Sequence, residues 1–186
     1  YNIQSQNDGT LTVTAKSIVP DPDDEKNKMS VGTLADVPYN GTEQVQKPEV
    51  KDGEKTLVEG TDYKLTFSED KTNVGTVTAT VTGKGNYTGE VTRTYQITPA
   101  KLTVTTPSDS MVYNGKALTA EGAISGFVNG ETAVFTTTGS QTEVGKSTNT
   151  YAIDWTAAGN TAKQGNYTIA EDLGTLTVTE TTDEIV

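Results

Sequence analysis

The strongest constraint on the fold is a strict alternation of threonine with small apolar side chains. One run reads Thr-Val-Thr-Ala-Thr-Val-Thr and places Val77, Ala79 and Val81 on one side of an extended backbone, with the threonines on the other. The same period of two recurs in residues 63–67 and 151–155. Such alternation is typical of strands that are buried on one face in antiparallel sheets, and threonine suits a pleated backbone.

Turn signals separate these runs. Asn-Gly pairs occur at residues 40–41, 114–115 and 129–130, and an Asp-Gly pair occurs at 52–53. These pairs tolerate the positive φ angles that tight hairpin turns require. The nearest approach to a helix is residues 157–163, but their glycine and the lack of an apolar stripe indicate a loop. We therefore expect an all-β chain.

Sequence elements recur in the same order along the chain. Tyrosines that introduce one such element stand at positions 1, 87 and 167, which are 86 and 80 residues apart. Other echoes are Tyr39-Asn40-Gly41 with Tyr113-Asn114-Gly115, Asn73-Val74-Gly75 with Glu143-Val144-Gly145, and Ala15-Lys16 with Ala100-Lys101. The repeats predict the end of a truncated preceding module in 1–14, a first whole module in 15–99, a second in 100–180, and a linker or tail in 181–186.

Each predicted module is a small β unit. A length of roughly 80 residues with about seven short strands and frequent turns favours an immunoglobulin-like sandwich. The fold prediction is therefore two tandem immunoglobulin-like β-sandwich modules, preceded by the last strand of a third. A β-grasp sheet carrying one short helix is the structural alternative. The hydrophobic fraction of 32% is low and favours several small cores over one large core.

Composition excludes several kinds of chemistry. The chain has no histidine and no cysteine, so it has no histidine-based triad, imidazole-ligated metal, disulfide or thiol nucleophile. Its formal net charge of -11 argues against nucleic acid as a partner, because phosphate contacts need Lys and Arg. No apolar run is long enough for membrane insertion. We expect no catalytic residues, no cofactor and no metal ligands.

Two successions of motifs resemble known repeat modules. In the first module, residues 60–63 (Gly-Thr-Asp-Tyr) are followed by residues 83–87 (Gly-Lys-Gly-Asn-Tyr), and this succession resembles a repeat found in large surface proteins of Gram-positive and gut bacteria. In the second module, residues 113–115, 126–131 and 174–178 resemble the MBG-type domain of the same kind of adhesin. The resemblance implies a non-enzymatic stalk or spacer on the bacterial cell surface, which presents a distal binding region.

Two other functions stay open. The chain could be a binding module that grips a host protein, a glycan or an immunoglobulin through a sheet edge or a groove. Residues 1–14 bear on this alternative, because an orphan strand pairs with the first module, pairs with a neighbouring chain, or stays loose. The other alternative is an accessory domain of an extracellular carbohydrate-active enzyme.

An acidic insert is the first candidate site. Asp21, Asp23 and Asp24 lie within residues 20–30, a segment that departs from the resembled repeat. Oxygen-rich clusters bind calcium, but this run lacks the glycine and the distal glutamate of an EF-hand loop. We favour a solvated, proline-stiffened loop. The adjacent carboxylates at residues 69–70 are interpreted as turn residues.

A covalent crosslink and an aromatic contact are the other candidates. The resemblance implies a possible crosslink of Lys to Asn or of Thr to Gln, for which the candidates are Lys16 and Lys101 in first strands and Gln96 and Asn166 in or near late ones. Exposed lysines at strand edges are the favoured interpretation. Trp155, the single tryptophan, alternates in register with apolar residues. We therefore expect it to pack in the core, although aromatic side chains also stack on sugars.

Overall fold

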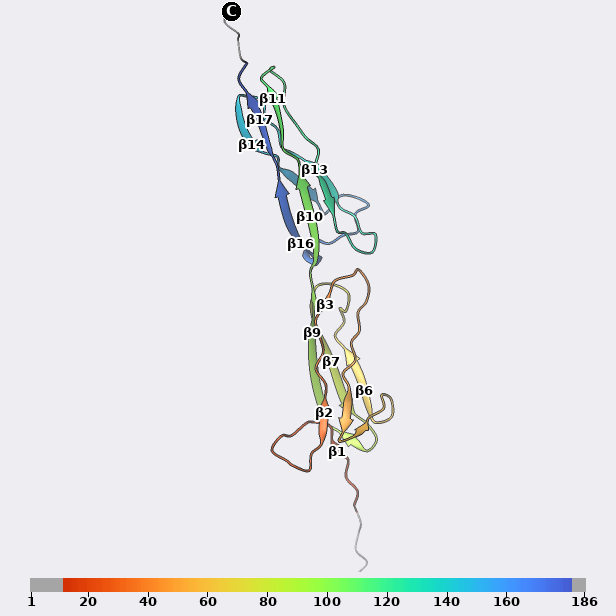
Figure 1. Ribbon diagram of the computed structural model, residues 1–186. Coiled ribbons are helices and arrows are strands. Elements are labelled where there is room, and N and C mark those ends of the chain that lie inside the picture. Colours follow the sequence, from red (N-terminus) through yellow and green to blue (C-terminus); the bar gives the residue numbers. More distant parts are fainter. Residues whose placement is uncertain (1–11, 182–186) are drawn as a thin grey trace, which may run out of the picture. The chain divides into compact units, whose positions relative to one another are not determined.

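The computed structural model describes residues 12–181, and these residues form an all-β structure (Figure 1). Within this range the elements are β-strands and a single short 3-10 turn. The strands are arranged in several small sheets, so the predicted all-β, sandwich-type fold is confirmed. The β-grasp alternative requires an α-helix, and residues 12–181 contain none. Nothing helical in that range has the length and apolar character that a membrane crossing needs.

The chain divides into two compact units. The described part of unit 1 comprises residues 12–35, 45–69 and 77–95, and that of unit 2 comprises residues 36–44, 70–76 and 96–181. The module boundaries inferred from the repeats stay a prediction. The strand predicted in 1–14 lies mostly outside the described residues, and residues 12–14 belong to no strand. Of the predicted tail, only Thr181 is described.

The first half of the chain contributes short strands and two long ones. The bounds are β1 Lys16–Ser17, β2 Met29–Val31, β3 Val37–Pro38, β4 Val50–Asp52, β5 Lys55–Thr56, β6 Tyr63–Phe67, β7 Gly75–Gly83, β8 Tyr87–Thr88 and β9 Glu90–Thr98. The sheets have the strand orders β1-β8, β2-β4-β5 and β3-β9-β7-β6. The threonine-rich run forms β7, where Val77, Ala79 and Val81 are buried as the alternation predicts.

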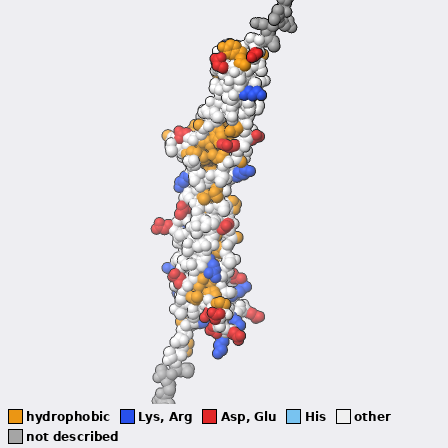
Figure 2. Space-filling view, turned by 90° about the vertical axis from the view of Figure 1, so that its left-hand side faces the viewer, with side chains coloured by type: hydrophobic (Ala, Val, Ile, Leu, Met, Phe, Trp, Pro, Cys, Tyr) orange, Lys and Arg blue, Asp and Glu red, His pale blue; other side chains and the backbone are white. Residues whose placement is uncertain are grey.

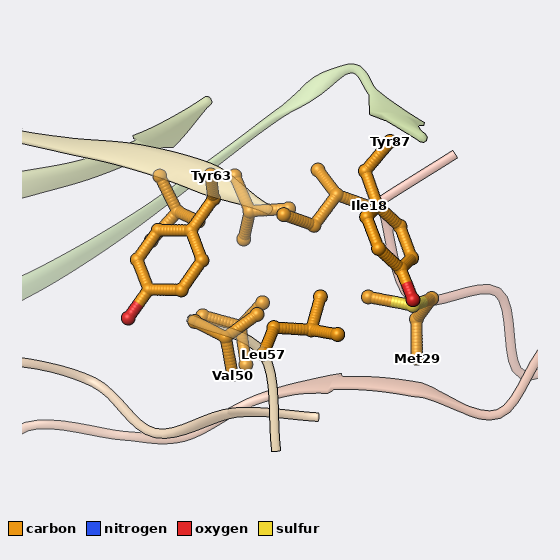
Figure 3. Packing of buried hydrophobic residues seen from close by; sticks show 9 residues of the cluster. Ile18, Met29, Val50, Leu57, Tyr63 and Tyr87 are labelled. Atoms are coloured by element: carbon orange, nitrogen blue, oxygen red, sulfur yellow. The ribbon is translucent and has the colours of Figure 1, made fainter. Parts of the chain in front are cut away.

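A hydrophobic cluster lies in the core of unit 1. Figure 3 shows Tyr63, Ile18 and Tyr87 facing Val50, Leu57 and Met29 across this core. The other buried members are Val31, Val81 and Val91. A cluster of this size agrees with the low hydrophobic fraction of the sequence.

The second half of the chain lies wholly in unit 2. Its elements are β10 Ala100–Thr106, β11 Asp109–Val112, β12 Ala123–Ser125, β13 Val134–Thr137, β14 Gly145–Thr148, β15 Tyr151–Asp154, the 3-10 turn Gln164–Asn166, β16 Tyr167–Leu173 and β17 Thr175–Thr179. They form sheets with the orders β12-β10-β16, β11-β17-β14 and β13-β15. Leu118, Leu176 and Val178 are buried together, with Met111 and Ala120 packed against them.

Parallel pairing joins the first and last strands of this half. Ala100 pairs with Tyr167 at the start of β10, and Val112 pairs with Thr179 at the end of β11. The offset is 67 residues throughout, so residues 100–112 lie beside residues 167–179 in one continuous register (Figure 1). The expectation of antiparallel sheets is therefore wrong for these strands, although neighbours such as β6 and β7 do pair antiparallel. Alternation reports which face of a strand is buried, but it carries no information about the direction of a distant partner.

A buried polar contact marks the point where this strand pair passes from one sheet to the next. The side-chain amide of Asn149 donates hydrogen bonds of 2.9 Å to the carbonyl oxygens of Pro107 and Ala120. The hydroxyl of Thr106 donates to the carbonyl oxygen of Asn149 at 2.7 Å. At Gly174 the two backbone segments approach so closely that a Cβ on this residue would lie 2.2 Å from the carbonyl carbon of Pro107.

Candidate functional site

The most organised group of side chains lies in unit 2 and begins with Tyr39. This residue follows β3, and its N–H donates to the carbonyl oxygen of Thr98 at 2.7 Å. The Asn40-Gly41 turn follows directly, with Gly41 at a φ of 76°. Asn40 Oδ1 accepts the N–H of Thr42 at 2.9 Å, which fixes the turn. The predicted Asn-Gly turn thereby sets the position of the tyrosine ring.

A carboxylate joins two tyrosines. The hydroxyl of Tyr39 donates to Oε1 of Glu131 at 2.5 Å, and the hydroxyl of Tyr167 donates to Oε2 at 2.7 Å. The two rings meet edge to face with centroids 5.6 Å apart. Both tyrosines are buried, whereas Glu131 is half-buried. We call Tyr39, Glu131 and Tyr167 the tyrosine–glutamate cluster.

Two further aromatic rings extend this cluster. Phe127 meets Tyr167 edge to face at 5.5 Å, and Trp155 stacks on Tyr167 at 6.2 Å. Phe127 and Trp155 also meet edge to face at 6.3 Å. Trp155 is half-buried, so its packing against other rings agrees with the core expectation only in part.

Burial and hydrogen bonding raise the pKa of both tyrosines of the cluster. Burial raises the pKa of Tyr39 above its usual value of 10.0, and the hydrogen bond to Glu131 raises the pKa further. The pKa of Tyr167 is raised by the same two causes, in the same order. A tyrosine hydroxyl donates its proton to an acceptor, and a carboxylate oxygen is a matching acceptor.

An asparagine pair lies beside the cluster in the same unit. The side chain of Asn166 is buried, accepts the N–H of Val74 at 2.9 Å and donates to Oδ1 of Asn73 at 2.9 Å. Asp70 holds Asn73 by accepting its backbone N–H at 2.9 Å and its side-chain amide at 2.8 Å. These bonds, the backbone one first, lower the pKa of Asp70 to about 2.

We call the tyrosine–glutamate cluster and the pair of Asn73 and Asn166 together the clasp. In the tyrosine–glutamate cluster each hydroxyl donor meets one carboxylate oxygen, and in the asparagine pair each side-chain amide has a matched partner. The contacts join residues 36–44 and 70–76 to residues 129–131 and 163–167 within unit 2. The arrangement is suited to holding segments together that are distant in the sequence.

An open pocket of unit 2 shares Trp155 with these aromatic contacts. It has a volume of about 390 Å³ and is lined chiefly by Tyr151, Ile153 and Trp155 of the β15 region and by Ile169 and Glu171 of β16. Tyr151 donates a short hydrogen bond to Glu171. Burial, and secondly this bond, raise the pKa of Tyr151 to about 12.

In the acidic insert, aspartate side chains accept hydrogen bonds from nearby backbone N–H groups, as in turns. Asp21 and Asp24 each accept a backbone N–H two residues ahead, at 3.0 Å and 2.9 Å. Among residues 12–181 no group of three or more acidic side chains is placed to hold a metal ion. Asp70 organises a turn, as interpreted from the sequence, because its Oδ1 accepts the N–H of Thr72 and of Asn73.

The candidate crosslink residues have other partners. Lys16 forms an ion pair with Asp52 at 2.5 Å, and the side-chain amide of Gln96 donates to the hydroxyl of Thr76 at 2.7 Å. Asn166 bonds Asn73 and Val74, as described above. Lys101 is exposed on β10, as favoured for a strand-edge lysine.

Charge on the surface is dispersed. On the face that Figure 2 shows, acidic and basic side chains are scattered among one another, and hydrophobic side chains gather in a few patches. Salt bridges such as Lys47 with Glu59 at 2.8 Å join exposed groups and contribute little stability. The net charge of -11 therefore marks no single-signed site on this face.

Sequence reasoning missed the central residue of the cluster. Glu131 follows an Asn-Gly turn and looks like any exposed turn glutamate, and its partner Tyr39 is 92 residues away. The repeated Asn-Tyr element, at residues 86–87 and 166–167, was the available signal, because Asn166 and Tyr167 both enter the clasp.

The described residues of unit 2 form a β-sheet structure without an α-helix. Residues 102–177 match the family model described as the MBG domain (YGX type), so this part of the chain is identified as an MBG-type module. The match confirms the resemblance drawn from residues 113–115, 126–131 and 174–178. A domain of this kind suggests a repeat module of a surface protein. No curated protein and no solved structure matches the chain significantly.

Proposed function

We propose that this chain is a non-enzymatic stalk or spacer segment of a bacterial cell-surface, adhesin-like protein, which lies outside the cell and presents a distal binding region. The observation that carries the proposal is the parallel pairing of residues 100–112 with residues 167–179. Because both segments run in the same direction, the chain reaches this strand pair at one end and leaves it at the other. A module with its connections at opposite ends adds its length to the chain, as a spacer must.

The same pairing is suited to bearing load. Tension between residues 100 and 179 pulls the two parallel segments past one another along their common axis. The backbone hydrogen bonds of β10 with β16 and of β11 with β17 then share the load, because none of them can break before the strands slide. Bonds that are loaded together resist more force than bonds that are loaded one at a time. The MBG match at residues 102–177 supports a surface-protein role for this module.

Single-molecule force measurements test the proposal. The chain contains no cysteine, so the substitutions Pro99→Cys and Glu180→Cys create two unique attachment points at the ends of the module. We expect one cooperative unfolding event with a contour-length gain of roughly 24 nm, from about 3.5 Å per released residue less the folded length. Unfolding at the low force of an unzipped hairpin would contradict a load-bearing role.

A second attachment geometry supplies the matched control. Lys116→Cys with Glu180→Cys places both points after the parallel strands β11 and β17, at the same end of the pair. Pulling there peels the strands apart one hydrogen bond at a time, so we expect a lower unfolding force from the same module. Equal forces in the two geometries would remove the mechanical argument.

A binding role is the second candidate, favoured by the open pocket beside β15. Its lining combines the rings of Tyr151 and Trp155 with the carboxylate of Glu171, a mixture that suits a glycan or an exposed segment of a host protein. Screening the chain on a glycan array tests this role. A signal that is lost with Ile169→Asp, at the pocket, and kept with Val134→Asp, an exposed residue outside its lining, would favour binding.

A further inference from the structure

Unit 2 contains two loop systems with the same local structure. The N–H of Tyr39 donates to Thr98 O at 2.7 Å, and the N–H of Tyr113 donates to Thr179 O at 2.8 Å. The next glycines, Gly41 and Gly115, have φ angles of 76° and 74°. The segments 39–41 and 113–115 therefore share their backbone conformation as well as their sequence.

The second loop of each system matches as well. Gly75 and Gly145 have φ angles of 153° and 146°, and each begins a strand after a valine. A backbone bond joins the two loops in both systems, from Gln44 to Lys71 at 2.8 Å and from Leu118 to Gln141 at 2.8 Å. Residues 36–44 with 71–75 are thus the structural counterparts of residues 110–118 with 141–145.

The two systems differ in what covers them. Tyr39 is only 5% exposed, because three other residues of the clasp, Glu131, Asn166 and Tyr167, lie over it and its neighbours. Tyr113 is 39% exposed. Beside it, Val112 is 54% and Val144 is 48% exposed. We call Val112, Tyr113 and Val144 the terminal surface.

We infer that the terminal surface is the docking site for a further module. That module presents a glutamate, an asparagine and a tyrosine, placed as Glu131, Asn166 and Tyr167 are placed in the clasp. The occupant is a module like that of residues 100–180, because those residues cover the equivalent surface around Tyr39. The inference rests on the proposed stalk function and names what the next element of the stalk must present.

Charge supports this choice of occupant. In the covered system, Oδ1 of Asn73 accepts from Asn166 at 2.9 Å and from the ammonium group of Lys163 at 3.3 Å. The counterpart of Asn73 at the terminal surface is Glu143, which is exposed. A carboxylate there can accept the same two donors and adds an ion pair with the lysine. A second copy of residues 100–180 therefore complements the terminal surface.

The test extends the chain by one module. Residues 1–180 are followed directly by a second copy of residues 100–180 and then by the native tail 181–186. One residue, Glu180, then separates Thr179 from the added copy, as Pro99 separates Thr98 from Ala100. The readout is the rate of tyrosine nitration by tetranitromethane, measured by mass spectrometry. In one version the added copy's counterpart of Tyr113 is replaced by phenylalanine, so that nitration in this sequence context reports Tyr113 alone.

We expect nitration of Tyr113 to slow by about the ratio of the two exposures, 39% to 5%, relative to the original chain. The reverse version, with Tyr113→Phe, monitors the equivalent tyrosine of the added copy, which should react as fast as Tyr113 does in the original chain. An unchanged rate at Tyr113 overturns the inference. An added copy that fails to fold also overturns it, because the terminal surface then does not support a folded module as the surface around Tyr39 does.

Substitutions in the added copy identify the contacts. Alanine at its counterparts of Glu131 and Asn166 should restore the fast rate at Tyr113, whereas alanine at its counterpart of the exposed Glu121 should not. Protection that survives loss of the glutamate and the asparagine would overturn the assigned contacts. The force measurement between residues 99 and 180 is made on the original chain without the added copy, so failure of docking and failure of the stalk proposal are distinguishable.

Discussion

Tyr167 donates its hydroxyl proton to Oε2 of Glu131 at 2.7 Å, a contact between residues that lie 36 positions apart. The other oxygen of this carboxylate accepts the hydroxyl of Tyr39, which is 92 positions from Glu131. One half-buried side chain therefore connects two distant parts of unit 2. This relationship is the basis of the first prediction.

Replacing Glu131 with alanine should destabilise unit 2. Two charge-assisted hydrogen bonds are lost and the hydroxyls of two buried tyrosines lose the acceptor of their protons, so we expect a loss of about 3 kcal/mol in the free energy of unfolding. Urea unfolding followed by Trp155 fluorescence measures this loss. Glu121→Ala removes an exposed carboxylate of the same unit and should change the free energy by less than about 0.5 kcal/mol. Equal effects of the two substitutions would refute the role of the cluster.

Gly174→Ala should destabilise the module strongly. The new Cβ would lie 2.2 Å from the carbonyl carbon and 2.3 Å from the carbonyl oxygen of Pro107, and backbone atoms cannot move aside cheaply. We expect a loss of about 3 kcal/mol or more. Gly165→Ala is the matched control, because its Cβ would meet nothing within 4 Å. Thermal unfolding of both variants checks the prediction, and a native melting temperature for Gly174→Ala would contradict it.

Asn149→Ala should also be costly. The substitution leaves the carbonyl oxygens of Pro107 and Ala120 without their side-chain donor at a fully buried position. Loss of these two bonds predicts a destabilisation of about 2–4 kcal/mol, measurable by urea unfolding. Truncation of the exposed Gln164 to alanine serves as the control. A small effect at Asn149 would mean that water replaces its amide group.

Alkaline pH should weaken the fold between about pH 10 and pH 12. The pKa of Tyr151 is raised from 10.0 to about 12 by burial and by its bond to Glu171, and the pKa of Tyr167 is also raised. Because the folded-state pKa exceeds the unfolded one, this stabilisation is complete below pH 10 and is lost as pH rises through the folded-state pKa. Absorbance at 295 nm and melting curves across this range test it. Tyr151→Phe should reduce the loss, and an unaltered profile would contradict the assignment.

Acid should release the turn that holds Asn73. The pKa of Asp70 is lowered from 3.8 to about 2 by the hydrogen bonds from Asn73 and Thr72. Because the folded-state pKa is depressed, its stabilising contribution is present above about pH 4 and is lost as pH falls towards 2. We expect Asp70→Asn to flatten the dependence of stability in this window, as measured by urea unfolding at several pH values. The exposed Asp172→Asn should leave the pH dependence as in the native chain.

The local structure was largely predictable from the sequence. The threonine run at residues 76–82 lies within β7, with Val77, Ala79 and Val81 buried. The Asn-Gly turns at residues 40–41 and 114–115 have positive φ at their glycines. Both features depend on neighbouring residues, which is why a period of two and a dipeptide suffice to predict them.

The sequence by itself determined the strands, the turns and the order in which elements recur, because each of these depends on residues that are close along the chain. Only the tertiary structure decided the parallel register of residues 100–112 with 167–179, the meeting of Tyr39 and Tyr167 on Glu131, and the difference in cover between Tyr39 and Tyr113. These contacts join residues tens of positions apart. Their partners are chosen by the path of the chain and by burial, neither of which a local pattern records.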